Sequence, residues 1–236
     1  MKLPSQTVRA RVTPVLAVAG LLASCARTPL PCRSPEHCPL QSECLANRCV
    51  PLGSDPVLAG TTRLVVEAAQ VAVVREGARV RGASRGALPA TVTLGGPEQA
   101  REQLLVRFPR SWAALDIDTA FLLLAPATSA DPTGADVQVR VALAAGPWAP
   151  GTLDEAPASR SPASAGLART RPPNPLRVDV TAQLKVLQGQ AASDHGLLVR
   201  AEDATGGAGA STQRGATYLT GADGELPRLD VYFRLH

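Results

Sequence analysis

The sequence predicts an all-β protein in which two antiparallel sheets pack together, behind an export signal and a small cysteine-rich segment. Three observations predict it. Apolar and polar residues alternate from residue 61 to the end of the chain, which is the pattern of half-buried strands. Glycine and proline together contribute 41 of the 236 residues, too many for a helical bundle. All five cysteines lie within residues 25–49, directly behind an apolar segment.

The first element, residues 1–24, has the composition of a secretory signal. Three basic residues precede an apolar stretch over residues 12–22, which is too short to span a bilayer. The stretch ends in Leu22-Ala23-Ser24-Cys25, which resembles the bacterial lipoprotein box. The resemblance implies cleavage before Cys25, palmitate and other acyl chains on this residue, and anchoring in the cell envelope, at the outer membrane. The alternative is an ordinary secreted protein with an accidental cysteine.

The second element is a cysteine spacer, residues 25–54. Cys32, Cys38, Cys44 and Cys49 lack the close CxxC spacing of metal knuckles, and an exported chain enters an oxidising compartment. Their even number predicts two disulfide bonds, for which three pairings are possible. We favour the interlaced pairing, Cys32–Cys44 with Cys38–Cys49. The segment resembles the small cysteine stubs of bacterial surface lipoproteins, and we expect a stiff spacer, mechanically separate from the body.

The third element, residues 55–236, is the predicted β-sandwich. Val137, Val139 and Val141 alternate with Gln138 and Arg140, as expected of a strand with one buried face. Clusters of Gly, Pro, Asp and Ser separate the strand patterns. Ten strands are expected, over residues 63–68, 71–75, 90–94, 104–108, 117–125, 137–143, 176–180, 196–202, 216–220 and 229–235.

Two segments of the body depart from the strand pattern. Residues 182–188 predict one short helix, capped by Thr181 or Asp179 and ended by Gly189. Residues 146–175 contain seven prolines among scattered Ala and Ser, and they predict a long surface loop.

Composition and charge exclude some functions. Residues 1–24 hold three basic residues and no acid, so the net charge falls from +4 to +1 without them. A nearly neutral chain with scattered arginines lacks the basic face that nucleic-acid binding needs. Only seven aromatic residues are present in the whole chain, which limits recognition by stacking.

Candidate catalytic residues occur only in weak patterns. Residues 82–86 match the G-x-S-x-G pattern around Ser84, but a new strand pattern follows in place of the helix that this motif requires. Asp116 and Asp118 fall on one face of a strand, where solvated carboxylates are the simpler interpretation than a hydrolytic pair. We therefore predict no enzyme and no cofactor, a structural calcium ion being the one exception left open. His37, His195 and His236 are weaker catalytic candidates still. The acidic pairs at 154–155 and 202–203 fall in loops and could donate oxygens to calcium, but they lack the EF-hand spacing.

Several segments of the body resemble, in order, the DNRLRE domain, which is also called carbohydrate-binding module family 96. The resemblance covers residues 61–235. It implies a jelly-roll-like sandwich that binds polysaccharide outside the cell, with Trp148 as the ligand-binding aromatic residue. The matching segments are residues 103–111, 118–124, 146–153, 178–184, 194–199 and 227–233.

The combined prediction is a membrane-anchored envelope lipoprotein whose sandwich binds polysaccharide and does not catalyse. The alternative is a structural or adhesive protein that binds another envelope protein and has no sugar site. Two roles are likewise open for Trp148. Its ring could face a sugar from the proline-rich loop, or the loop could act as a cover over the end of the sandwich.

Overall fold

A computed structural model describes residues 31–32, 37–39, 42–45, 48–51, 60–75, 89–96, 102–127, 137–150, 153, 155–168, 175–202, 215–221 and 225–235. For residues 43–45 and 48 it describes the backbone alone. Residues 1–30, with Cys25 and the signal segment, lie outside this set. So do Ser84, Asp154, Asp203, His236 and the predicted boundary after residue 54.

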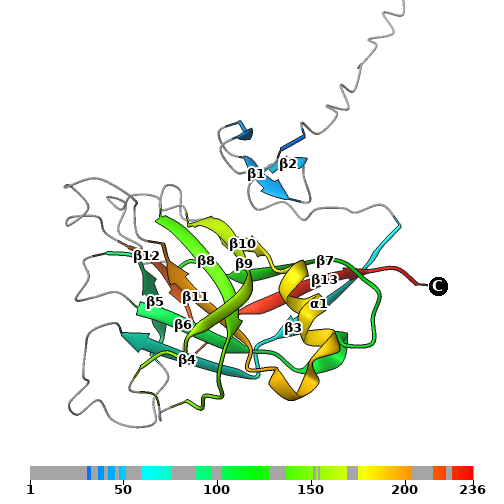
Figure 1. Cartoon of the computed structure of the whole chain (residues 1–236). Helices are drawn as coiled ribbons and strands as arrows, with labels where there is room; N and C mark the ends of the chain where they lie inside the picture. Colours follow the sequence, from blue (N-terminus) through cyan, green and yellow to red (C-terminus); the bar gives the residue numbers. More distant parts are fainter. Residues whose placement is uncertain are drawn as a thin grey trace, which may run out of the picture.

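Two antiparallel sheets form the body (Figure 1), and they confirm the predicted all-β sandwich. The four-stranded sheet has the order β10-β7-β13-β3, and the five-stranded sheet has the order β4-β6-β11-β8-β9. The first contains β10 (Leu176–Asp179), β7 (Ile117–Leu124), β13 (Arg228–Phe233) and β3 (Thr62–Glu67). The second contains β4 (Gln70–Arg75), β6 (Glu102–Arg107), β11 (Leu197–Ala201), β8 (Val137–Ala144) and β9 (Ser159–Ala168).

A small third sheet closes one side of the sandwich. It pairs β5 (Thr91–Leu94) with β12 (Ala216–Leu219), and β12 continues the four-stranded sheet through the bridge between Pro126 and Tyr218. On the other flank, Glu102 accepts a hydrogen bond from the Thr93 backbone at 2.7 Å, which connects β5 with β6. Consecutive strands therefore cross repeatedly from one sheet to the other, as expected of a jelly-roll-like sandwich.

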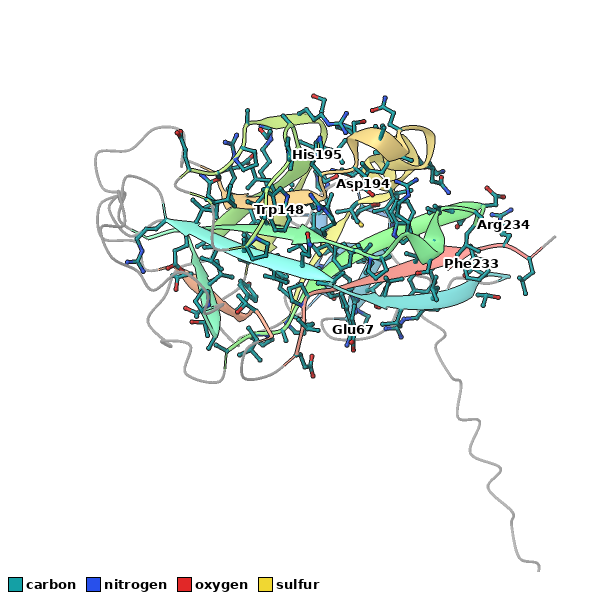
Figure 2. The ribbon with its side chains drawn as sticks, turned by 90° about the horizontal axis from the view of Figure 1, so that it is seen from below. Glu67, Trp148, Asp194, His195, Phe233 and Arg234 are labelled. Atoms are coloured by element: carbon teal, nitrogen blue, oxygen red, sulfur yellow. A yellow bond between two sulfur atoms is a disulfide. The ribbon has the colours of Figure 1, made fainter. Side chains whose placement is uncertain are left out.

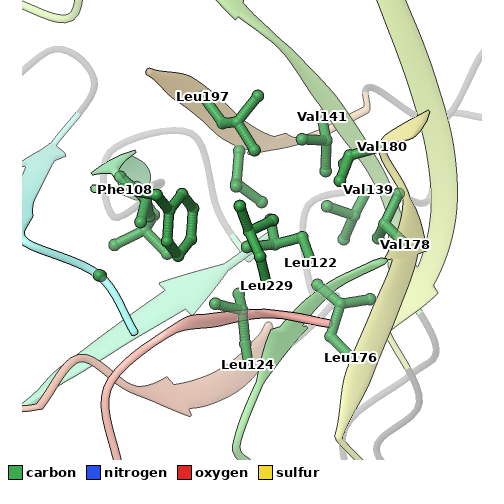
Figure 3. Close-up of a cluster of buried hydrophobic side chains, with 14 of the residues drawn as sticks. Phe108, Leu122, Leu124, Val139, Val141, Leu176, Val178, Val180, Leu197 and Leu229 are labelled. Atoms are coloured by element: carbon green, nitrogen blue, oxygen red, sulfur yellow. The ribbon is translucent and has the colours of Figure 1, made fainter. Parts of the chain in front are cut away.

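Alternate residues of each strand point into the space between the sheets. Leu122 and Leu124 of β7 meet Val139 and Val141 of β8 there, and all four side chains are fully buried (Figure 3). The alternation recognised in the sequence places these residues on one face of each strand, so the core follows directly from the pattern. Trp112, in the short 3-10 helix Arg110–Trp112, packs against the same core.

Helix α1 (Thr181–Gly189) lies across one flank of the sandwich, against β7 and β9 (Figure 1). Val180 occupies the N-cap position and no side chain caps the helix there, so the predicted cap at Thr181 or Asp179 is wrong. The Asp179 carboxylate nevertheless accepts a hydrogen bond from the Thr181 backbone N–H at 2.9 Å, which satisfies a donor of the first turn. The Thr181 hydroxyl bonds outside the helix, accepting from the Ala120 backbone at 2.8 Å. A second 3-10 turn, Ala191–Ser193, follows α1 and leads into β11.

The ten predicted strands are present with ends shifted by one or two residues, but the predicted loop over residues 146–175 is wrong in part. Residues Ser159–Ala168 form β9, the longest strand, which pairs with β8. It is an edge strand of the sheet, where a proline such as Pro162 does not interrupt a central ladder. Gly166 lets β9 approach β10, because a Cβ there would lie 2.5 Å from a methyl carbon of Val178.

Candidate functional site

The cysteine spacer contains a two-stranded hairpin of β1 (Ser42–Leu45) and β2 (Arg48–Pro51). A disulfide bond joins Cys38 to Cys49, which confirms that part of the predicted pairing. Cys32 is buried and also disulfide-bonded, while the side chain of Cys44 lies outside the described part. The pairing of Cys32 with Cys44 therefore stays a prediction.

The sulfur atoms of Cys32, Cys38 and Cys49 lie within 4.8 Å of one another, which is close enough for a shared metal ion. All three are already engaged in disulfide bonds, and the oxidised sulfurs are not available as thiolate ligands. Elsewhere in the described residues no comparable group of His, Cys, Asp and Glu side chains occurs. The donor set thus fits two covalent bridges and not a metal centre.

The cysteine spacer contacts the body through Val50, while its mechanical independence stays a prediction. Val50 of β2 packs against Phe121, Leu123 and Tyr232, which point outward from the four-stranded sheet. These three side chains are at most 4% exposed, and the rings of Phe121 and Tyr232 meet edge to face. An outer face of a sandwich normally carries polar residues toward water, so this apolar patch marks the place where the cysteine spacer lies.

A buried carboxylate lies on the same outer face of the four-stranded sheet, beside the edge strand β3. Asp230 of β13 is 1% exposed, and its Oδ2 atom lies 2.7 Å from the Arg63 guanidinium of β3. The Arg228 guanidinium approaches its Oδ1 atom at 3.6 Å. Both arginines remain partly exposed, so they neutralise Asp230 from the solvent side of the sheet.

Trp148 lies on the opposite side of the sandwich, in a covering loop that joins β8 to β9 (residues 145–158). Its ring is 6% exposed and packs on outward-facing residues of the five-stranded sheet, including Leu105 and Leu198. The Nε1 atom donates to the His195 backbone carbonyl at 2.5 Å, and the Arg107 guanidinium lies 5.1 Å from the ring centroid (Figure 2). The ring therefore offers no open face to a sugar, and the geometry is that of a cover.

The turn that receives this hydrogen bond is fixed from several sides. Arg110 contacts Asp194 at 3.1 Å and donates to the Leu187 carbonyl at 3.0 Å. Asp194 also accepts from the Gly196 backbone at 3.1 Å, and Gly196 has a φ of +81°. A side chain at Gly196 would collide with the Val106 carbonyl, so the turn requires glycine. His195, expected to be exposed there, is half-buried and contributes its backbone carbonyl to this network.

The acidic residues considered as a hydrolytic pair or as calcium ligands do not converge in the described residues. Asp116 and Asp118 are exposed, and Asp118 forms an ion pair with Arg234 at 3.0 Å, near the end of the last strand (Figure 2 labels Arg234). Glu202 is exposed and lies 3.7 Å from Arg140. Each of these carboxylates is therefore solvated or paired at the surface. A glycoside hydrolase instead holds two acids facing each other in a cleft.

Sequence reasoning missed the contact between the cysteine spacer and the sheet, although a signal was present. Phe121, Leu123 and Tyr232 occupy the strand positions at which alternation predicts polar residues. Three apolar side chains on the solvent face of neighbouring strands indicate a covering element. The buried Asp230 gave no such signal, because an acid on an outward-facing strand position is ordinarily read as solvated.

The part of the chain that the structure describes contains no helix of the length and apolar character needed to cross a membrane. The sequence was also compared with known proteins. No protein-family model matches the chain, and no curated protein matches it.

Proposed function

We propose that this chain is a lipid-anchored cell-envelope protein whose sandwich has a structural or adhesive role and binds protein, without catalysis. The observation that carries the binding class is the use of the aromatic residues. Six of the seven aromatic side chains are buried, and Phe233 is half-buried. A polysaccharide site that works by stacking needs an exposed aromatic ring. The aromatic rings of this chain are instead packed against other side chains.

The anchor is proposed from the Leu22-Ala23-Ser24-Cys25 box, and the arrangement of the cysteine spacer supports it. Cys32, the first described cysteine, lies seven residues after Cys25, in a segment that is cross-linked by disulfides and contacts the body through Val50. A short, cross-linked connection of this kind suits a protein that is held close to a membrane surface by acyl chains.

The proposed absence of catalysis is supported by the state of the candidate groups. Within the described ranges, Asp116 and Asp118 are exposed and His195 uses its backbone. The side chains that converge most closely, Arg110 with Asp194 and Arg63 with Asp230, are ion pairs that hold neighbouring elements together.

Labelling with palmitate tests the anchor. The full chain should incorporate labelled palmitate and partition into detergent, and Cys25→Ser should do neither. The matched control is Ser24→Ala, which keeps a small residue before the cleavage point and should retain the label. Labelling that persists in Cys25→Ser would show that the lipid is not on this residue and would overturn the anchor.

Affinity electrophoresis tests the binding class independently of the anchor. The protein should migrate at the same rate in gels with and without neutral or acidic polysaccharide, because it has no exposed ring for sugars. Retardation by one polysaccharide would establish the glycan-binding alternative. If that retardation disappears in Trp148→Phe, which keeps an aromatic ring, the site would involve the indole N–H or the covering loop.

A further inference from the structure

We infer that Arg140 and Arg200, side by side on the outer face of the five-stranded sheet, bind acidic side chains of a partner protein. Arg140 belongs to β8 and Arg200 to the neighbouring strand β11, and the register of the two strands places the residues directly opposite each other (Figure 1). The inference rests on the proposed protein-binding function. It adds the chemical class of the partner and the place at which the partner docks.

The packing of the neighbouring residues fixes the direction of both side chains. Val139 and Val141 of β8 and Val199 of β11 lie in the core between the sheets. Because successive side chains of a strand point to opposite faces, Arg140 and Arg200 point outward. Arg140 is exposed and Arg200 is half-buried, so a partner that lies on this face can reach both side chains.

Arg200 differs from the other arginines in having no partner within the chain. Among the arginines whose side chains the structure describes, it alone makes no hydrogen bond, ion pair or ring contact. Each of the others has at least one such contact, as Arg75 has with Glu102 at 2.9 Å. The Arg200 guanidinium therefore keeps its full capacity to bind an anion.

Arg140 is only partly neutralised. The Glu202 carboxylate lies 3.7 Å from its guanidinium, which is longer than a hydrogen bond, and the two side chains are 37% and 45% exposed. Arg107, on the same face, donates to the neutral side chain of Gln70 at 3.0 Å. The outward positions of β6, β8 and β11 thus carry three arginines and no acid, with Glu202 just beyond the end of β11.

The geometry of the pair fits one carboxylate. The Glu202 N–H donates to the Gln138 carbonyl at 2.8 Å, and the two types of pair alternate along an antiparallel ladder. Arg140 and Arg200, two residues away, therefore form a hydrogen-bonded pair, whose Cα atoms lie about 5.5 Å apart. Like charges directly opposite each other are unfavourable. A carboxylate between the guanidinium groups removes the repulsion and accepts charge-assisted hydrogen bonds from both.

The surroundings of the pair favour a protein over an acidic polysaccharide. A glutamate carries its carboxylate on a flexible stem that can reach between two guanidinium groups, whereas a uronic acid carries it on the sugar ring, which must then lie on the sheet. Sugar rings need an aromatic ring to stack on, and Trp148 on this face is 6% exposed. The exposed Gln138 and the exposed, small Ala165 flank Arg140 and leave room for a peptide backbone.

Binding of a fluorescein-labelled hexaglutamate peptide to the full chain in non-ionic detergent, followed by fluorescence anisotropy, tests the inference. The wild type should bind the peptide and lose affinity as salt rises from about 0.05 M to about 0.5 M. Arg140→Gln and Arg200→Gln should each weaken binding by roughly fivefold. The double variant should lose less than the product of the two, because both groups hold one carboxylate. Arg234→Gln, which removes an exposed arginine from the other sheet, should bind as the wild type does.

The urea midpoint separates a binding role from a structural one. Arg200→Gln should leave the midpoint unchanged or raise it, because the substitution relieves the contact between like charges. A lowered midpoint with unchanged peptide affinity would assign a structural role and overturn the inference. A wild type that does not bind hexaglutamate would also overturn it, while the proposed function would stand.

Affinity electrophoresis in polygalacturonate distinguishes the two sources of carboxylate. The wild type should migrate as it does without the polymer. Retardation that is lost in both Arg140→Gln and Arg200→Gln would assign the pair to an acidic polysaccharide and overturn the inference. Retardation that persists in both variants would overturn the proposed binding class alone, because it would place the sugar site elsewhere.

Discussion

The indole Nε1 of Trp148 donates a hydrogen bond of 2.5 Å to the backbone carbonyl oxygen of His195. The two residues belong to different connections, since Trp148 lies between β8 and β9 and His195 precedes β11. The bond therefore holds the covering loop against the turn that starts the central strand of the five-stranded sheet. With Arg107 over its ring and Leu105 beneath it, Trp148 acts as a structural residue.

Trp148→Ala should lower the free energy of unfolding by about 3–5 kcal/mol, because it removes a buried ring and leaves a cavity. Trp148→Phe keeps most apolar contacts and loses the hydrogen bond, so the expected loss is about 1–3 kcal/mol. Urea denaturation followed by circular dichroism measures both. Leu235→Ala, at a position 77% exposed, is the control and should change stability by less than about 0.5 kcal/mol. An unchanged midpoint for Trp148→Ala would contradict the burial of the ring.

Asp230→Asn should lower the free energy of unfolding by about 1–3 kcal/mol. The carboxylate is buried between Arg63 and Arg228, and the amide cannot neutralise both guanidinium groups. Asp118→Asn is the matched control, because its ion pair with Arg234 is exposed on both sides. An exposed pair contributes less than about 1 kcal/mol, so Asp118→Asn should be close to neutral. Equal losses for the two variants would mean that the burial of Asp230 does not matter.

Peptide mapping of the unreduced protein should recover Cys38 linked to Cys49. Cleavage after Glu43 and after Arg48 separates Cys38, Cys44 and Cys49 into three peptides, so each linkage has its own mass. Cys32 should also lack a free thiol, because it is disulfide-bonded. A link from Cys32 to Cys44 would complete the interlaced pairing. Stoichiometric zinc, or free thiols at Cys38 and Cys49, would refute the assignment.

Val50→Asp should loosen the contact between the cysteine spacer and the four-stranded sheet. The substitution places a charge against Phe121, Leu123 and Tyr232, and we expect a loss of about 1–2 kcal/mol in unfolding free energy. Binding of a hydrophobic dye should rise, since the apolar patch becomes accessible to solvent. Leu235→Asp, which adds the same charge at an exposed site, should change neither quantity. Absence of dye binding by Val50→Asp would indicate that another part of the chain covers the patch.

Local patterns predict the strands of this fold well because each strand buries one face. The alternation of Val139 and Val141 with Arg140 is sufficient to define a strand and its inward side. Strand β9 escaped prediction because its residues are small and polar and include Pro162. Its pairing with β8 depends on the neighbouring strand and not on its own side chains. An edge strand of this kind has no local pattern to recognise.

The candidate sites were harder to predict, because burial on a sheet's outer face depends on contacts between distant segments. Trp148 stands in a proline-rich connection, where a ring is equally compatible with exposure and with packing. Its burial depends on Leu105 and Leu198, which come from two other strands. The cysteines were easier, since their number and compartment constrain the chemistry. The even number of cysteines and the oxidising compartment predict disulfide bonds, and the favoured interlaced pairing includes the Cys38–Cys49 bond.

The cysteine spacer and the covering loop lie on opposite outer faces of the sandwich, and this sets the orientation of an anchored molecule. Cys32 lies seven residues after Cys25, so even a fully extended connection would hold Cys32 within about 25 Å of the proposed lipid anchor. The four-stranded sheet would then face the bilayer and the Trp148 side would face outward. Anything that approaches the membrane from solution would first meet Arg107, Arg140 and the loop over Trp148.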